Sequence, residues 1–128
     1  MDKSKLRELY QYYDLQPSDV FKHQHYVILT RQAIDKIIAK EQLSIRYEVI
    51  QCSPEYCCFK AIMEKDGKHI ETFGSALYGD FKNGNTLSHY VAEMAEKRAK
   101  SRITLMCTGF YELGVFGEDE SESFKRNG

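Results

Sequence analysis

The sequence predicts an α+β fold: a three-stranded antiparallel sheet, made of a β-hairpin and the preceding strand, packed by a long C-terminal helix and preceded by two N-terminal helices. Between residues 43 and 78, apolar residues alternate with polar ones, as in half-buried strands. Between residues 86 and 109 they recur at the spacing of a helix. An Asp-Gly pair at residues 66–67 marks a two-residue hairpin turn within the strand region.

Length and composition indicate one globular domain. The chain has 128 residues, of which 42% are hydrophobic and 29% charged, and its formal net charge is -1. A basic field over the whole protein is therefore excluded, and nucleic-acid binding would need a local patch. No run approaches the ~20 apolar residues of a membrane span, and residues 1–9 lack the apolar core of a signal peptide. We expect a cytoplasmic protein that does not contact a membrane.

The two ends of the chain differ in character. We expect residues 1–117 to form the single domain and residues 118–128 to be an acidic, disordered tail, because the tail has few apolar residues. The simplest role of such a tail is to keep the protein in solution. Acidic tails with an aromatic residue also contact protein partners or compete with nucleic acid for a basic face.

Two helices are expected before the sheet. The first covers residues 2–14, and the second follows a short extended segment at residues 24–29 and is capped by Thr30. Their apolar stripes are formed by Leu6, Leu9, Tyr10 and Tyr13 in the first helix and by Ala33, Ile34, Ile37 and Ile38 in the second.

The strands are expected at residues 43–49, 56–64 and 69–78, and the turn sets their register. If Lys65 lies opposite Lys68, then Phe59 lies opposite Gly74. The long helix should cover the resulting apolar face, and Gly74 leaves space either for that helix or for the Phe59 ring. This face consists of Cys57, Phe59, Ala61, Met63, Ile70, Thr72, Gly74 and Ala76.

The long helix is expected from Thr86, which can cap its start, to Gly109, which can end it. Its thin apolar side would lie close on the sheet. Four cations stand near its middle: Lys97, Arg98, Lys100 and Arg102.

The simplest interpretation of a run of charged residues is a solvent-exposed helix face, and it explains the two lysines of the helix. Lys97 and Lys100 each follow a glutamate by four residues, which favours ion pairs along the helix. Arg98 has no such partner, and Arg102 follows Arg98 itself by one turn. The two arginines therefore face a polyanion, find partners elsewhere in the fold, or have none. Arginine suits phosphate because its planar fork donates two hydrogen bonds at once.

The loop at residues 79–85 offers a second candidate contact. It is polar and rich in glycine, and it carries an aromatic residue beside a cation, Phe81 and Lys82. An ordinary mobile connection is the simpler interpretation, and a ligand-binding loop is the alternative. After Gly109, residues 110–117 form either a short strand or an irregular cover.

The sequence contains no catalytic motif, so we expect a protein that is not an enzyme and has no cofactor. Its four cysteines include no CxxC pair and are best interpreted as small buried hydrophobes, so no metal site is expected.

Two segments, FKAIMEKDGKHIETFGSALYGD and SHYVAEMAEKRAKSRITLMCTGFYELG, resemble the core of the single-strand annealing proteins of the Rad-fifty-two and ERF types, which act in recombination in phages, mobile elements and eukaryotes. That family has a helix of the form E-x-A-E-x-R-A-x-x-R-A after a hairpin with Asp-Gly at its tip. The matching residues are Glu93, Ala95, Glu96, Arg98, Ala99 and Arg102, with Ile103 where alanine is usual.

The resemblance implies a homo-oligomeric protein that binds single-stranded DNA without sequence preference and acts in annealing during recombination or repair, without bond chemistry. It implies DNA-backbone contacts by Arg98 and Arg102, with Lys97 weaker. The alternative is a small cytoplasmic, self-associating interaction module that does not bind DNA. The candidate DNA-binding residues are Arg98, Arg102, Lys97, Lys100, Lys82 and Phe81.

Overall fold

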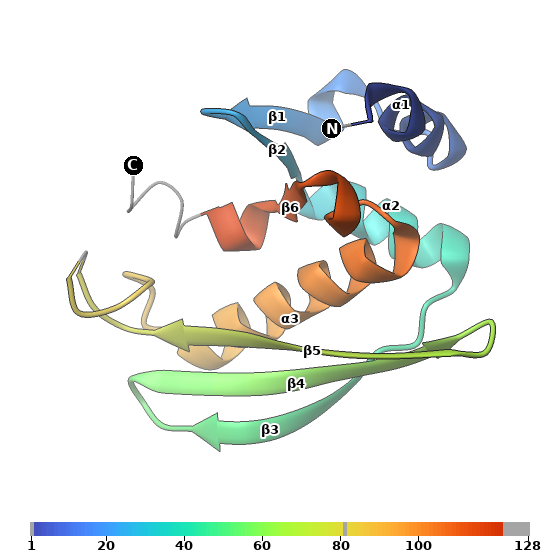
Figure 1. Ribbon diagram of the computed structural model, residues 1–128. Helices are drawn as coiled ribbons and strands as arrows, with labels where there is room; N and C mark the ends of the chain where they lie inside the picture. Colours follow the sequence, from blue (N-terminus) through green and yellow to red (C-terminus); the bar gives the residue numbers. More distant parts are fainter. Residues whose placement is uncertain (1, 81, 122–128) are drawn as a thin grey trace.

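A computed structural model describes residues 2–80 and 82–121. Two three-stranded sheets lie on opposite sides of the long helix α3 (Val91–Thr108), as Figure 1 shows. The α+β class and the long helix are confirmed, whereas the second sheet was not predicted. Within the part of the chain that the structure describes, no helix has the length and apolarity needed to cross a bilayer.

The larger sheet contains the predicted hairpin in the predicted register. Its strands are antiparallel, and Lys65 pairs with Lys68 and Phe59 with Gly74. Asp66 and Gly67 both have positive φ, at 52° and 80°, as their turn requires. The strands are β3 (Arg46–Cys52), β4 (Tyr56–Lys65) and β5 (Lys68–Leu77), in the order β3-β4-β5.

Helix α3 lies directly on this sheet because Gly74 has no side chain. A Cβ atom on Gly74 would lie 2.3 Å from the amide nitrogen of Ala99 and 2.4 Å from the carbonyl oxygen of Ala95. Both alanines are fully buried, as are Ala61 and Ile103 in the same contact. The thin apolar side of the helix therefore faces the sheet as predicted.

The start of α3 differs from the prediction. The helix begins at Val91 rather than after Thr86, because residues 85 and 86 pair back onto the end of β5. The amide of Thr86 donates to the carbonyl of Leu77 (3.2 Å), and its hydroxyl accepts from the amide of Ser88 (3.1 Å). The predicted end is confirmed, since Gly109 takes φ 90° after the last turn.

The second sheet joins both ends of the domain. Its central strand β2 pairs antiparallel with β1 and parallel with β6, so that Val27 lies beside Val115. The extended segment expected at residues 24–29 corresponds to β2. Residues 115–117 form a strand, one of the two alternatives left open for residues 110–117. The strands are β1 (Val20–His23), β2 (Tyr26–Leu29) and β6 (Val115–Gly117).

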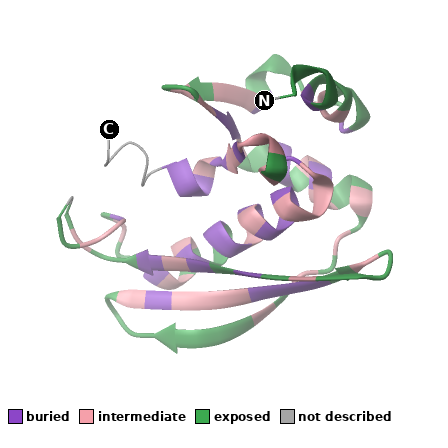
Figure 2. Cartoon of the chain, in the orientation of Figure 1, coloured by how far each residue is buried: buried purple, intermediate pink, exposed green. Residues whose placement is uncertain are grey.

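Two α-helices precede the larger sheet as predicted, and a short 3-10 helix adds to them. Thr30 caps the second α-helix by accepting from the amide of Ala33 (3.2 Å). Their apolar stripes pack with β2 and β6 into one core, shown as the buried region above α3 in Figure 2. The helices are α1 (Lys3–Tyr12), the 3-10 helix η1 (Pro17–Asp19) and α2 (Arg31–Glu41), and a further 3-10 turn η2 (Tyr111–Leu113) follows α3.

The outer face of the larger sheet is charged. Lys60 pairs with Glu71 at 2.9 Å. The pKa of His69 is raised mainly by its hydrogen bond to Glu71 and, to a smaller extent, by its hydrogen bond to Glu64. Strand β3 lies at the edge of the sheet, and its Val49 is 60% exposed. Val49 still pairs with Phe59, and the register shifts only after it, at a bulge between Val49 and Gln51.

Candidate functional site

The four predicted cations of α3 surround one small residue. Successive helical residues are about 100° apart, so Ser101 lies between Lys97 and Lys100 on one side and Arg98 and Arg102 on the other. We call these five residues the cationic face of α3. Helix α3 lies between the larger sheet on one side and α2 and the C-terminal end of the described chain on the other (Figure 1). Lys97, Lys100 and Ser101 line a cavity together with residues of α2 and Asp119. Arg98 and Arg102 also reach β5, where Nη1 of Arg102 donates to the carbonyl of Phe73 (3.2 Å).

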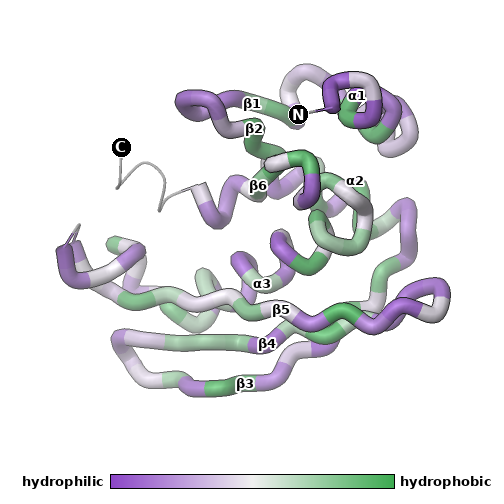
Figure 3. The backbone as a smooth tube through the Cα atoms, viewed as in Figure 1, coloured by the Kyte–Doolittle hydropathy of each residue, from purple (hydrophilic) through white to green (hydrophobic). Residues whose placement is uncertain are grey.

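The centre of this face is covered by residues 118–121, a helical turn that we call the acidic segment. Asp119, Glu120 and Ser121 are 5%, 7% and 3% exposed, although the segment is hydrophilic (Figures 2 and 3). The expectation of a disordered tail is therefore wrong for residues 118–121, because their carboxylates find partners in the fold. Residues 122–128 lie outside the described residues.

Glycine at position 117 allows this close approach. A Cβ atom on Gly117 would lie 2.7 Å from the Cβ of Ser101. Strand β6 therefore delivers the acidic segment directly onto the middle of the cationic face.

Three consecutive carboxylates each meet a donor. Glu118 accepts from the amide of Arg31 at the start of α2 (2.9 Å), where the helix dipole favours negative charge. Asp119 accepts from Nε of Arg31 (2.6 Å) and from the Ser101 hydroxyl (3.3 Å). The protein thus already binds a short run of its own anions at this place.

Glu120 meets Arg102 in a two-pronged contact. Nε and Nη2 of Arg102 donate to the two carboxylate oxygens of Glu120 at 3.2 and 2.9 Å. The hydrogen bond to Glu120 raises the pKa of Arg102. This fork-to-fork geometry is the one that arginine also forms with phosphate.

Arg98 has partners elsewhere in the fold, one of the alternatives that the sequence left open. Its side chain is 4% exposed, and it donates to the carbonyls of Ser75 (2.9 Å), Asn85 (3.0 Å) and Asp119 (3.0 Å). The side-chain oxygen of Asn85 also accepts from it (2.9 Å). Arg98 therefore joins β5, the loop before α3 and the acidic segment, and its guanidinium lies inside the protein.

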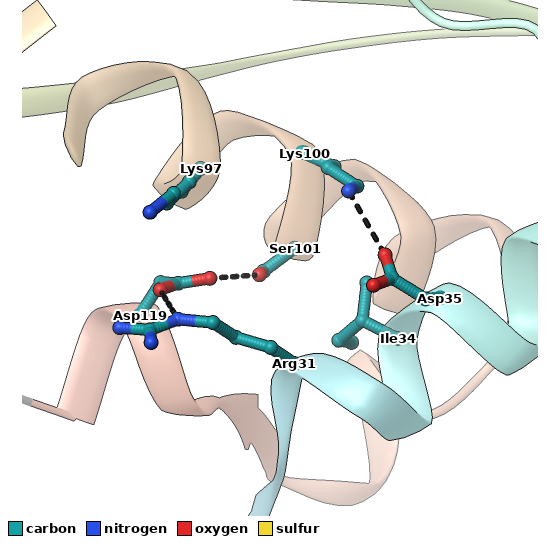
Figure 4. A pocket seen from close by; sticks show the side chains of 7 residues that line it. All are labelled: Arg31, Ile34, Asp35, Lys97, Lys100, Ser101 and Asp119. Atoms are coloured by element: carbon teal, nitrogen blue, oxygen red, sulfur yellow. Dashed lines mark hydrogen bonds and ion pairs between the residues drawn. The ribbon is translucent and has the colours of Figure 1, made fainter. Parts of the chain in front are cut away.

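The other two cations line a cavity of about 140 Å³ between α2, α3 and the acidic segment (Figure 4). Arg31, Lys97 and Ser101 lie around the Asp119 carboxylate in this view, and Lys100 lies nearer to α2. Its seven lining residues are Arg31, Ile34, Asp35, Lys97, Lys100, Ser101 and Asp119.

The lysines are not paired along the helix as the spacing suggested. Lys100 forms its ion pair with Asp35 of α2 at 2.9 Å. Lys97 is exposed and has no hydrogen-bond or ion-pair partner within residues 2–80 and 82–121. An external anion could therefore bind Lys97 without displacing a partner among the described residues.

The loop candidates do not join this cavity. The backbone amide of Lys82 donates to Asp80 (3.1 Å), and the Lys82 side chain is exposed. Phe81 lies outside the described residues. The structure therefore brings together Lys97, Arg98, Lys100 and Arg102 of the six predicted residues, and leaves Lys82 in the loop.

Sequence reasoning missed the acceptors and one cation. Arg31, Asn85 and Asp119 had no signal in their own neighbourhoods, because their partners lie far away along the chain. The one available hint was that the long helix carries arginines without partners along the helix while the C-terminal segment is acidic, in a chain of net charge -1.

The described residues offer little other reactive chemistry. Cys57 is buried, but Cys52 is exposed, so the prediction that the cysteines are buried holds only in part. No group of three histidine, cysteine, aspartate or glutamate residues in the described ranges is placed to hold a metal ion.

Comparisons of the chain with protein-family models, with curated proteins and with solved structures give no match. The resemblance to annealing proteins stays a prediction.

Proposed function

We propose that this protein binds single-stranded DNA without sequence preference through the cationic face of α3, as the annealing proteins that it resembles do. The observation that carries the proposal is the docking of Glu118, Asp119 and Glu120 on donors from α2 and α3. A site that binds consecutive carboxylates presents the donors that consecutive phosphates need.

The chemistry of the site suits backbone contact rather than base recognition. Lys97 has no partner among the described residues, Lys100 pairs with the exposed Asp35, and Arg102, itself about one-third exposed, pairs with the buried Glu120. Contacts of this kind position a nucleic-acid strand but carry no sequence information. The expected activity is therefore binding and presentation of a single strand for pairing, in recombination or repair.

A self-associating protein that does not bind DNA is the second candidate, and the edge strand β3 favours it. Within the described ranges, β3 pairs with β4 alone in the larger sheet, and Val49 and Ile50 on it are 60% and 54% exposed. An unpaired edge with apolar side chains can pair with another chain. If this second candidate is correct, the protein does not bind DNA at any salt concentration.

Replacing Lys97 and Lys100 together by glutamine is expected to weaken DNA binding and its salt dependence. Each phosphate contact on a single strand contributes about 0.7 to the slope of log affinity against log salt, so the slope should fall by about 1.4. Fluorescence anisotropy of a labelled oligothymidine, titrated at several salt concentrations, measures this change.

Lys5 on α1 provides the matched control, because it is exposed and its side chain has no partner in the described part of the chain. Lys5→Gln should leave the slope unchanged, and a mixed-sequence oligonucleotide of equal length should bind as well as oligothymidine. A folded, unaltered protein that fails to bind at low salt would refute the proposal and favour the second candidate.

A further inference from the structure

The acidic segment and single-stranded DNA require the same donors. Asp119 and Glu120 occupy Arg31, Ser101 and Arg102, and both carboxylates are more than nine-tenths buried in doing so. A phosphate group cannot reach these donors while the carboxylates hold them, because like charges in one site repel. We propose that the acidic segment is an internal competitor that DNA displaces; this inference rests on the proposed function.

The described part of the acidic segment is held by polar contacts. Residues 118–121 form one helical turn after a strand of three residues, Val115–Gly117. They add no large apolar side chain to the core, and their contacts with α2 and α3 are polar. Opening residues 118–121 breaks these polar contacts, including the bond from Arg98 to the Asp119 carbonyl (3.0 Å), but exposes no large apolar side chain of the segment, so its cost is that of a local opening rather than of global unfolding.

Displacement would enlarge the DNA site. With the acidic segment in place, Lys97 is the cation of this face without a hydrogen-bond or ion-pair partner among residues 2–80 and 82–121, and the cavity beside it measures about 140 Å³. A second cavity of about 170 Å³ lies beyond Glu120, lined by Arg98 and Arg102 among others. Removing the segment joins the two sides of the cationic face into one continuous surface that crosses Ser101.

The competitor also sets the dependence of affinity on salt. The contacts between the acidic segment and its arginines are ion pairs, of which Arg31–Asp119 measures 2.6 Å and Arg102–Glu120 2.9 Å. An incoming strand must replace these carboxylates, so the unaltered chain gains fewer net phosphate contacts than the face could provide.

The test compares Asp119→Asn/Glu120→Gln with Glu8→Gln/Glu112→Gln in the full chain. Both variants remove two negative charges, and Glu8 and Glu112 are exposed without side-chain partners among the described residues. The first variant should bind oligothymidine at least about fivefold more tightly than the control, with a salt slope steeper by about 1.4 for two regained contacts.

The outcomes separate the two proposals. Equal affinity of both variants, with clear binding by the unaltered protein, overturns the competitor and leaves the DNA site standing. Absence of binding by every folded form overturns the DNA site and the competitor with it. Binding by the first variant alone supports both.

A second measurement uses the unaltered chain and avoids any effect of substitution on folding. Hydrogen exchange of the amides of residues 119–121 should speed up when oligothymidine is added, while exchange in β4 stays constant. Slower or unchanged exchange in the acidic segment at saturating DNA would overturn the competitor.

Discussion

Replacing Arg98 by methionine is expected to lower the free energy of unfolding by about 3–5 kcal/mol. The substitution removes a guanidinium that is 4% exposed and leaves the carbonyls of Ser75, Asn85 and Asp119 without their donor. Buried acceptors that lose their partners cost the full desolvation penalty. Urea denaturation followed by circular dichroism measures the loss.

Lys97→Met is the matched control for Arg98→Met. It also removes a cation from α3, but Lys97 is exposed and has no partner in the described ranges, so its effect should stay within about 0.5 kcal/mol. Equal small losses for the two variants would show that the buried contacts of Arg98 contribute little.

Because Arg98 stabilises the fold, it is a poor choice for a variant that tests DNA binding. A variant of Arg98 that loses DNA binding does not identify a phosphate contact, because the same change loosens β5 and the loop at Asn85. Lys97 and Lys100 are better probes, since neither holds the core together.

Gly74→Ala is expected to destabilise the protein by about 2–3 kcal/mol, in the upper part of the range for overpacking. Its new Cβ atom would meet backbone atoms of Ala99 and Ala95 at 2.3 and 2.4 Å, so α3 must move away from the sheet. A movement of α3 also opens the contacts of Ala61 and Ile103, which are fully buried against it.

Lys68→Ala controls for changes in β5 itself. Lys68 is exposed on the same strand, and its side chain has no hydrogen-bond or ion-pair partner among the described residues. The unfolding midpoint in urea should shift strongly for Gly74→Ala and only slightly for Lys68→Ala. A Gly74→Ala protein as stable as the unaltered chain would contradict the close packing of α3 on β5.

The features that local signals determine were predictable from the sequence. The Asp66-Gly67 turn fixed the register of β4 and β5, down to the pairing of Phe59 with Gly74. Thr30 marked the start of α2, and Gly109 marked the end of α3. In each case one residue has a conformational or capping preference that its neighbours do not oppose.

The features that depend on distant pairing were not predictable in the same way. Strand β6 has three residues and exists because it pairs with β2, almost ninety positions earlier in the chain. Thr86 has the chemistry of a helix cap, but its backbone pairs with Leu77 instead. The order of residues 118–121 likewise comes from Arg31 and Arg102, which lie on two other elements.

The most direct measurement is a titration of the ¹⁵N-labelled chain with oligothymidine, followed by amide chemical shifts. If the cationic face binds DNA, the largest shifts occur at residues 97–102, at Arg31 and in the acidic segment, and they shrink as salt is raised. Shifts confined to the β3 edge, or none at saturating oligothymidine and low salt, would contradict DNA binding by α3.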